Sequence, residues 1–119
     1  MADVDARLQL NYLMDFYGPL LTPHRQEVMR LYCEEDLTQQ EIAQQLDITR
    51  QGVFDTIAKA KRQLAAYEGK LGLVARYREQ AAAARRCLQA LDRLHARPED
   101  KPALQEARQA LENMISDRM

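Results

Sequence analysis

The segment from Leu37 to Leu64, LTQQEIAQQLDITRQGVFDTIAKAKRQL, constrains the fold of this chain more than any other. Thr38 and Glu41 have the spacing of a capping box, in which each side chain satisfies an unpaired backbone N–H at the start of a helix. Asp47 tolerates the left-handed backbone conformation that ends such a helix, and Thr49 is a favourable N-cap for the next one. The sequence therefore predicts two short helices that meet at a tight corner.

The apolar residues of this segment repeat at helical spacing on both sides of the corner. We expect two buried stripes, formed in the first helix by Ile42, Ala43 and Leu46 and in the second by Val53, Ile57, Ala60 and Leu64. Ala43 is small, as a close approach of two helices requires. Capping, corner and spacing together predict a helix-turn-helix.

Two helices are predicted before this motif. Apolar spacing indicates the first from Asp5 to Tyr17, ended by Gly18 and Pro19. The second begins near Pro23. The first helix is expected to turn an aromatic-rich face inward, made of Leu8, Tyr12, Leu13, Phe16 and Tyr17, and the second to bury Val28, Leu31 and Tyr32.

A helical hairpin is predicted after the motif. One long amphipathic helix covers 73–96, a turn covers 97–102 and a last helix covers 103–119. The apolar residues of the hairpin form one seam on each helix, Val74, Tyr77, Ala81, Ala84, Leu88, Leu91 and Leu94 on the first and Leu104, Ala107, Leu111, Met114 and Ile115 on the second.

The chain is expected to divide into a helix-turn-helix domain, 1–68, and this hairpin, 69–119. The two seams can be buried against each other, against the amino-terminal half or against a second copy of the chain, so we expect either a homodimer or a monomer that docks a partner. An apolar line of Tyr67, Leu71 and Val74 across the joint favours the dimer.

Composition supports an all-α fold. The chain has four Gly, four Pro, two Phe and no Trp, and no segment requires a strand. Cys33 and Cys87 lack metal-ligand spacing, so we expect partly buried free thiols in a reducing compartment. No apolar window is long enough to cross a bilayer, which predicts a cytoplasmic protein without a membrane partner.

Charge is distributed unevenly along the chain. Residues 1–60 carry five Lys and Arg against ten Asp and Glu, a net charge of −5, whereas residues 61–119 carry twelve against eight, a net charge of +4. Proteins that bind duplex DNA usually present a basic surface, because neutralising phosphates supplies much of their affinity. Here the half that contains the helix-turn-helix is acidic.

The exposed positions at the start of the second motif helix are polar. In a DNA-binding helix-turn-helix, these residues reach base edges in the major groove. We expect Arg50 to bond guanine and Gln51 to bond adenine, with Thr49 and Asp55 projecting from the same turns. Phosphates repel the carboxylate of Asp55, although it can accept from a cytosine amine. An outward Phe54 would indicate contact with a partner or with the hairpin, whereas inward packing is commoner for such a ring.

Further positions are candidates for contacts with the DNA backbone. Lys59 follows one turn later, Gln39 opens the preceding helix, and Lys61 and Arg62 would lie alongside phosphates. The alternative interpretation is that all these residues are solvated side chains of an ordinary three-helix domain.

The sequence does not predict an enzyme or a cofactor. His24 and His95 have no neighbouring carboxylate or cysteine arrangement typical of a metal site or nucleophile dyad. The acidic run at 34–36 lacks the spacing of a calcium loop. No glycine-rich phosphate loop is present.

Three segments resemble the YlxM family of small bacterial proteins, whose helix-turn-helix is similar to region 4 of sigma factors. They are NYLMDFYGPLLTPHR at 11–25, LYCEEDLTQQEIAQQLDITRQGVFDTI at 31–57 and LAAYEGKLGL at 64–73. The resemblance covers the first two-thirds of the chain. It implies a role linked to the signal recognition particle, because members are encoded beside the particle's GTPase and its receptor.

Two functions follow as hypotheses. The first is a regulator that binds duplex DNA through its helix-turn-helix. The second is an interaction module that binds the GTPase or the RNA of the signal recognition particle without reading a DNA sequence.

Overall fold

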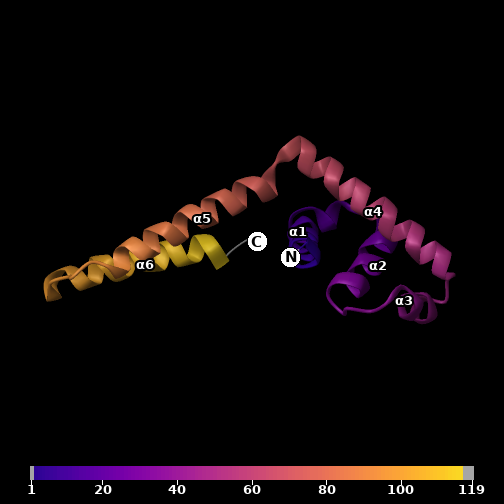
Figure 1. Cartoon of the computed structure of the whole chain (residues 1–119), viewed down its shortest axis with the longest axis horizontal. Coiled ribbons are helices and arrows are strands. Elements are labelled where there is room, and N and C mark those ends of the chain that lie inside the picture. Colours follow the sequence, from indigo (N-terminus) through magenta and orange to yellow (C-terminus); the bar gives the residue numbers. More distant parts are fainter. Residues whose placement is uncertain (1, 117–119) are drawn as a thin grey trace. The chain divides into compact units, whose positions relative to one another are not determined.

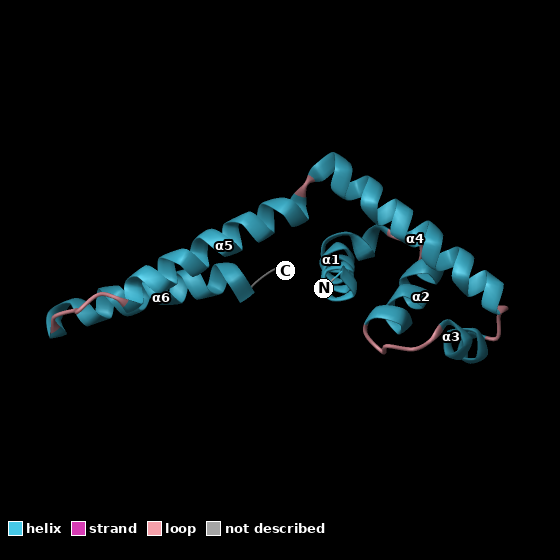
Figure 2. Cartoon of the chain, viewed as in Figure 1, coloured by secondary structure: helices cyan, strands magenta, loops and turns pink. Residues whose placement is uncertain are grey.

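The computed structural model describes residues 2–116, and side chains from Val4 onward. Every regular element in this range is helical (Figure 2), which confirms the all-α prediction. The helices are α1 (Ala2–Tyr17), α2 (Pro23–Cys33), α3 (Gln39–Leu46), α4 (Arg50–Leu71), α5 (Leu73–Asp92) and α6 (Lys101–Ser116), with short 3-10 helices at Gly18–Leu20 and Pro98–Asp100. Helices long and apolar enough to cross a membrane are absent from the described range.

The chain forms two units, Met1–Val74 and Ala75–Met119. The boundary expected from the sequence, after residue 68, falls inside α4, which continues to Leu71. Val74 still belongs to the first unit because its side chain is buried in the core of that unit.

The corner between α3 and α4 is built as the sequence predicts. The Thr38 hydroxyl accepts the Glu41 N–H at 3.1 Å, and the Glu41 carboxylate accepts the Thr38 N–H at 2.9 Å. Asp47 adopts φ 57°, and its N–H and that of Ile48 both donate to the Ala43 carbonyl. The Thr49 hydroxyl accepts the Gly52 N–H at 2.9 Å, which caps α4. These bonds satisfy the backbone groups that a sharp turn between two helices would leave unpaired.

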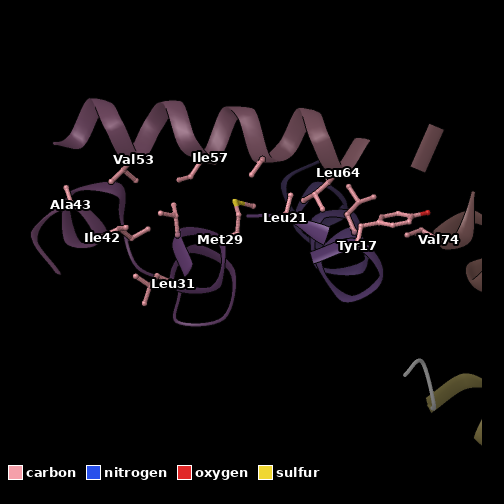
Figure 3. Packing of buried hydrophobic residues seen from close by; sticks show 13 residues of the cluster. Tyr17, Leu21, Met29, Leu31, Ile42, Ala43, Val53, Ile57, Leu64 and Val74 are labelled. Atoms are coloured by element: carbon pink, nitrogen blue, oxygen red, sulfur yellow. The ribbon is translucent and has the colours of Figure 1, made fainter. Parts of the chain in front are cut away.

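The core of the first unit lies along one side of α4. Figure 3 shows Val53, Ile57 and Leu64 pointing from α4 toward side chains of the three preceding helices. The predicted inner face of α4 is buried in full, since Ala60 is also inaccessible. Burying one such side chain contributes roughly 1.5–3 kcal/mol, more than a single helix cap contributes. Packing against α4 therefore holds the helix-turn-helix in place (Figure 1).

Polar side chains secure the junction between α4 and α5. Gly72 ends α4 in the left-handed conformation, at φ 64°. The Tyr17 hydroxyl donates to Glu68 at 2.6 Å and accepts the Leu73 N–H at 3.1 Å. The same Glu68 oxygen accepts the Val74 N–H at 3.0 Å. Two first-turn N–H groups of α5 thus find acceptors on α1 and α4.

In the second unit, α5 and α6 lie side by side as an antiparallel hairpin (Figure 1). Arg108 of α6 pairs with Asp92 at the end of α5, at 2.6 Å, and the Tyr77 hydroxyl donates to the carbonyl of Ile115 near the other end. These contacts tie the two helices together at both ends of the hairpin.

Several predicted inward positions are wrong. Helix α5 ends at Asp92 rather than Ala96, and the N–H groups of Arg93 and Leu94 close its last turn by donating to carbonyls three residues earlier. In the hairpin, a unit of two helices has too little interior to cover every apolar residue of its seams. Predicted inward residues that are exposed are Leu8 in α1 and Leu94, Ala107 and Met114 in the hairpin, and the thiol of Cys87 is exposed rather than partly buried.

Candidate nucleic-acid interface

The first two turns of α4 carry an exposed polar surface. The buried residues of α4 point into the core, so Arg50, Gln51 and Asp55 project to solvent on the other sides of the helix. Thr49 precedes them, but its hydroxyl is occupied by the N-cap bond to Gly52. The predicted role of Thr49 in base contact therefore competes with its role as a cap.

The start of α3 and the start of α4 form one surface hollow. Its lining side chains are Gln39, Arg50, Gln51 and Phe54. Gln39 is therefore a neighbour in space of Arg50 and Gln51, from which it is separated in sequence. We call the four lining residues, together with Asp55, the α4 polar surface.

Phe54 is the apolar member of this surface. Its side chain is 53% exposed, so of the two positions considered from the sequence the outward one is observed. An exposed aromatic ring beside two hydrogen-bonding side chains can contact a thymine methyl group or a partner protein. The outward position of Phe54 could have been inferred from its helical position, because it directly follows Val53, which points into the core.

Gln51 and Asp55 are joined by a hydrogen bond. The Gln51 amide donates to the Asp55 carboxylate at 3.0 Å, one helical turn away. This bond leaves Gln51 one N–H and its carbonyl oxygen, the pair that a bidentate contact with adenine uses. Asp55 therefore orients Gln51, a role distinct from the predicted contact with cytosine.

The predicted backbone-contacting residues diverge around α4. Lys59 and Arg62 are exposed. Lys61 instead extends toward α2, where its ammonium lies 5.4 Å from the centre of the Tyr32 ring. Such a cation–π contact contributes about 0.5–1 kcal/mol at an exposed site. The structure thus places Lys61 in an intramolecular contact, apart from the hollow at the start of α4.

Neither histidine belongs to a ligand cluster within the described residues. His24 and His95 are both exposed, and residues 2–116 contain no group of three or more His, Cys, Asp or Glu side chains arranged to hold a metal ion.

The family model described as "Putative helix-turn-helix protein, YlxM / p13 like" matches residues 4–115. The chain belongs to this UPF0122 family. The match confirms the resemblance read from the three sequence segments and extends it through the hairpin. The family description is of a helix-turn-helix protein and names no enzyme activity.

Curated relatives are also UPF0122 proteins. One from Halalkalibacterium halodurans is 37% identical over 109 residues, which cover 92% of this chain and 99% of the relative. One from Desulforamulus reducens is 45% identical over 73 residues, 61% of this chain and 62% of the relative. One from Geobacillus kaustophilus is 42% identical over 74 residues, 62% of this chain and 67% of the relative. No solved structure matches the chain at a significant level.

Proposed function

We propose that this protein is a regulator that binds duplex DNA, with the start of α4 in the major groove. The observation that carries the proposal is the α4 polar surface, in which Gln39, Arg50 and Gln51 from both motif helices line one hollow. In a helix-turn-helix, the second helix presents its opening residues to base edges and the first crosses the backbone. The family's description as helix-turn-helix proteins supports nucleic-acid binding.

Each residue has a distinct role in this proposal. The Arg50 guanidinium donates two hydrogen bonds to guanine, and the Gln51 amide, oriented by Asp55, bonds adenine. Gln39 contacts a phosphate and fixes the register of the protein on the duplex. Each bidentate base contact contributes about 1–3 kcal/mol of discrimination.

The test is the double variant Arg50→Ala with Gln51→Ala, compared with the wild type on duplexes selected from a genomic fragment library. The matched control is Arg97→Ala with Gln105→Ala, which removes the same two residue types from exposed positions in the other unit. We expect the first variant to lose sequence preference by tenfold or more, with helicity by circular dichroism retained, and the control to bind as the wild type does. Equal binding by all three proteins would exclude base reading by this surface.

A second candidate function is binding of the GTPase or RNA of the signal recognition particle, as the family resemblance implies. Phe54 favours it, because aromatic residues and arginine are enriched at protein interfaces, and exposed Phe54 lines the same hollow as Arg50. The test is fluorescence titration with each component, using Phe54→Ala against Leu20→Ala, which truncates a similarly exposed apolar residue elsewhere in the first unit. Loss confined to Phe54→Ala supports this function, and absence of binding to both components refutes it.

A further inference from the structure

The exposed side of α5 carries arginines that form no ion pair with a carboxylate of the described residues. Arg85 and Arg86 are exposed within the helix, and Arg93 is exposed in the turn that follows it. From Gln80 to Leu91 the sequence contains no Asp or Glu. The residues three and four positions from Arg85 and Arg86 are alanine, leucine and glutamine, so neither has the helical ion pair that surface helices commonly use. We call Arg85, Arg86 and Arg93 the α5 arginine group.

Two other arginines of the same hairpin are paired with carboxylates. Arg97 pairs with Asp100 at 3.1 Å, and Arg108 pairs with Asp92 at 2.6 Å. Within residues 2–116, the three members of the α5 arginine group make no such ion pair. The hairpin thus pairs Arg97 and Arg108 and leaves the α5 arginine group available to an external anion.

The surroundings of the group favour a phosphate backbone. Arg85 and Arg93 are about 12 Å apart along the helix axis, the length of three to four base pairs of duplex. Guanidinium groups bond phosphate oxygens in a bidentate manner. Ala82 and Ala90 beside them are exposed and small. The exposed side of α5 has no aromatic residue, whereas surfaces that bind single strands stack bases on aromatic rings. The surface therefore fits a duplex better than a single strand.

The charge distribution along the chain supports a contact between the α5 arginine group and DNA phosphates. The half of the chain that contains the helix-turn-helix has a net charge of −5, so it lacks the positive charge that usually supplies affinity for DNA. We propose that the α5 arginine group binds the phosphate backbone of the duplex DNA whose sequence α4 reads. This inference rests on the function proposed above and assigns to α5 the sequence-independent part of the affinity.

The experiment replaces all three residues at once, Arg85→Gln, Arg86→Gln and Arg93→Gln, in the full chain. The control, Arg7→Gln, Arg30→Gln and Arg97→Gln, removes the same charge from arginines that are ion-paired. Binding to a duplex selected by the wild type and to a shuffled duplex is measured by fluorescence anisotropy at four salt concentrations. A duplex RNA of the same sequence is measured in parallel, and circular dichroism verifies that helicity is retained.

Each arginine that contacts a phosphate contributes about 0.9 to the slope of log K against log salt. We therefore expect the α5 variant to lower the magnitude of the slope by about 2–3 on both DNA duplexes, with an unchanged affinity ratio between them. The control should keep the wild-type slope. A wild-type slope in the α5 variant refutes this inference while leaving base reading by α4 intact. A reduction seen with duplex RNA alone also refutes it. Wild-type protein that binds neither DNA duplex refutes the proposed function and this inference with it.

Discussion

Replacing Tyr17 by phenylalanine removes one hydroxyl from the junction between α4 and α5. That hydroxyl is buried, with the residue 1% exposed, and donates to the Glu68 carboxylate at 2.6 Å. A hydrogen bond to a charged group contributes about 1.5–3 kcal/mol. The Leu73 N–H also loses its acceptor, but Leu73 is 37% exposed, so water can replace this second bond at small cost. We therefore expect Tyr17→Phe to lower the free energy of unfolding by about 2 kcal/mol.

The assay is urea unfolding followed by circular dichroism at pH 7. The control is Tyr32→Phe, which removes the same atom from a half-buried tyrosine whose ring, rather than its hydroxyl, contacts Lys61. This control should change the free energy of unfolding by less than about 0.5 kcal/mol, as most substitutions away from special features do. A loss for Tyr17→Phe no larger than that of the control refutes the assigned role of the hydroxyl.

The same junction makes the folded protein lose stability at alkaline pH. Burial raises the pKa of Tyr17 above its usual value, and the hydrogen bond to Glu68 raises it further. Because the pKa of Tyr17 is higher in the folded state than in the unfolded state, its neutral hydroxyl contributes its full stabilisation below the unfolded pKa, about 10. This contribution is lost as the pH rises through the folded pKa. The wild type should therefore lose more stability than Tyr17→Phe when urea unfolding is repeated above pH 10. Parallel declines would contradict this coupling.

Other predictions test the joint, the cap and the thiols. Gly69 lies in open space within α4, so Gly69→Ala should stabilise the protein by about 0.5–1 kcal/mol, whereas Gly72→Ala, at φ 64°, should destabilise it by about 1–2 kcal/mol; urea unfolding that gives both changes the same sign contradicts the assigned backbone conformations. Thr49→Ala should cost about 1 kcal/mol in the same assay, and a neutral result refutes the N-cap. Burial raises the pKa of the Cys33 thiol, so iodoacetamide at pH 8 should modify exposed Cys87 several times faster; equal rates by mass spectrometry contradict the burial difference.

The helix-turn-helix was predictable because its signals are local. The Thr38 and Glu41 capping box, the left-handed Asp47 and the Thr49 cap each depend on residues within four positions of one another. The inner face of α4 was predictable for a similar reason, since helical spacing alone places Val53 on the side of the core.

Contacts between distant residues could not be predicted in this way. The bond from Tyr17 to Glu68 joins residues far apart in sequence, and apolar spacing had assigned Tyr17 only to the core. Lys61 likewise shares a basic run with Arg62, although only Lys61 contacts Tyr32 on α2. The hollow at the start of α4 depends on how α3 and α4 pack, so the sequence identified Gln39 and Arg50 without showing that they are neighbours.

Reading of duplex DNA by the α4 polar surface is the proposed function of this protein. The most direct measurement is a parallel titration of the purified chain against duplex DNA selected from a genomic library and against the RNA and the GTPase of the signal recognition particle, at two salt concentrations. We expect sequence-dependent duplex binding that weakens steeply as salt rises. Tight binding of a particle component, with duplex binding absent or insensitive to salt, would contradict it.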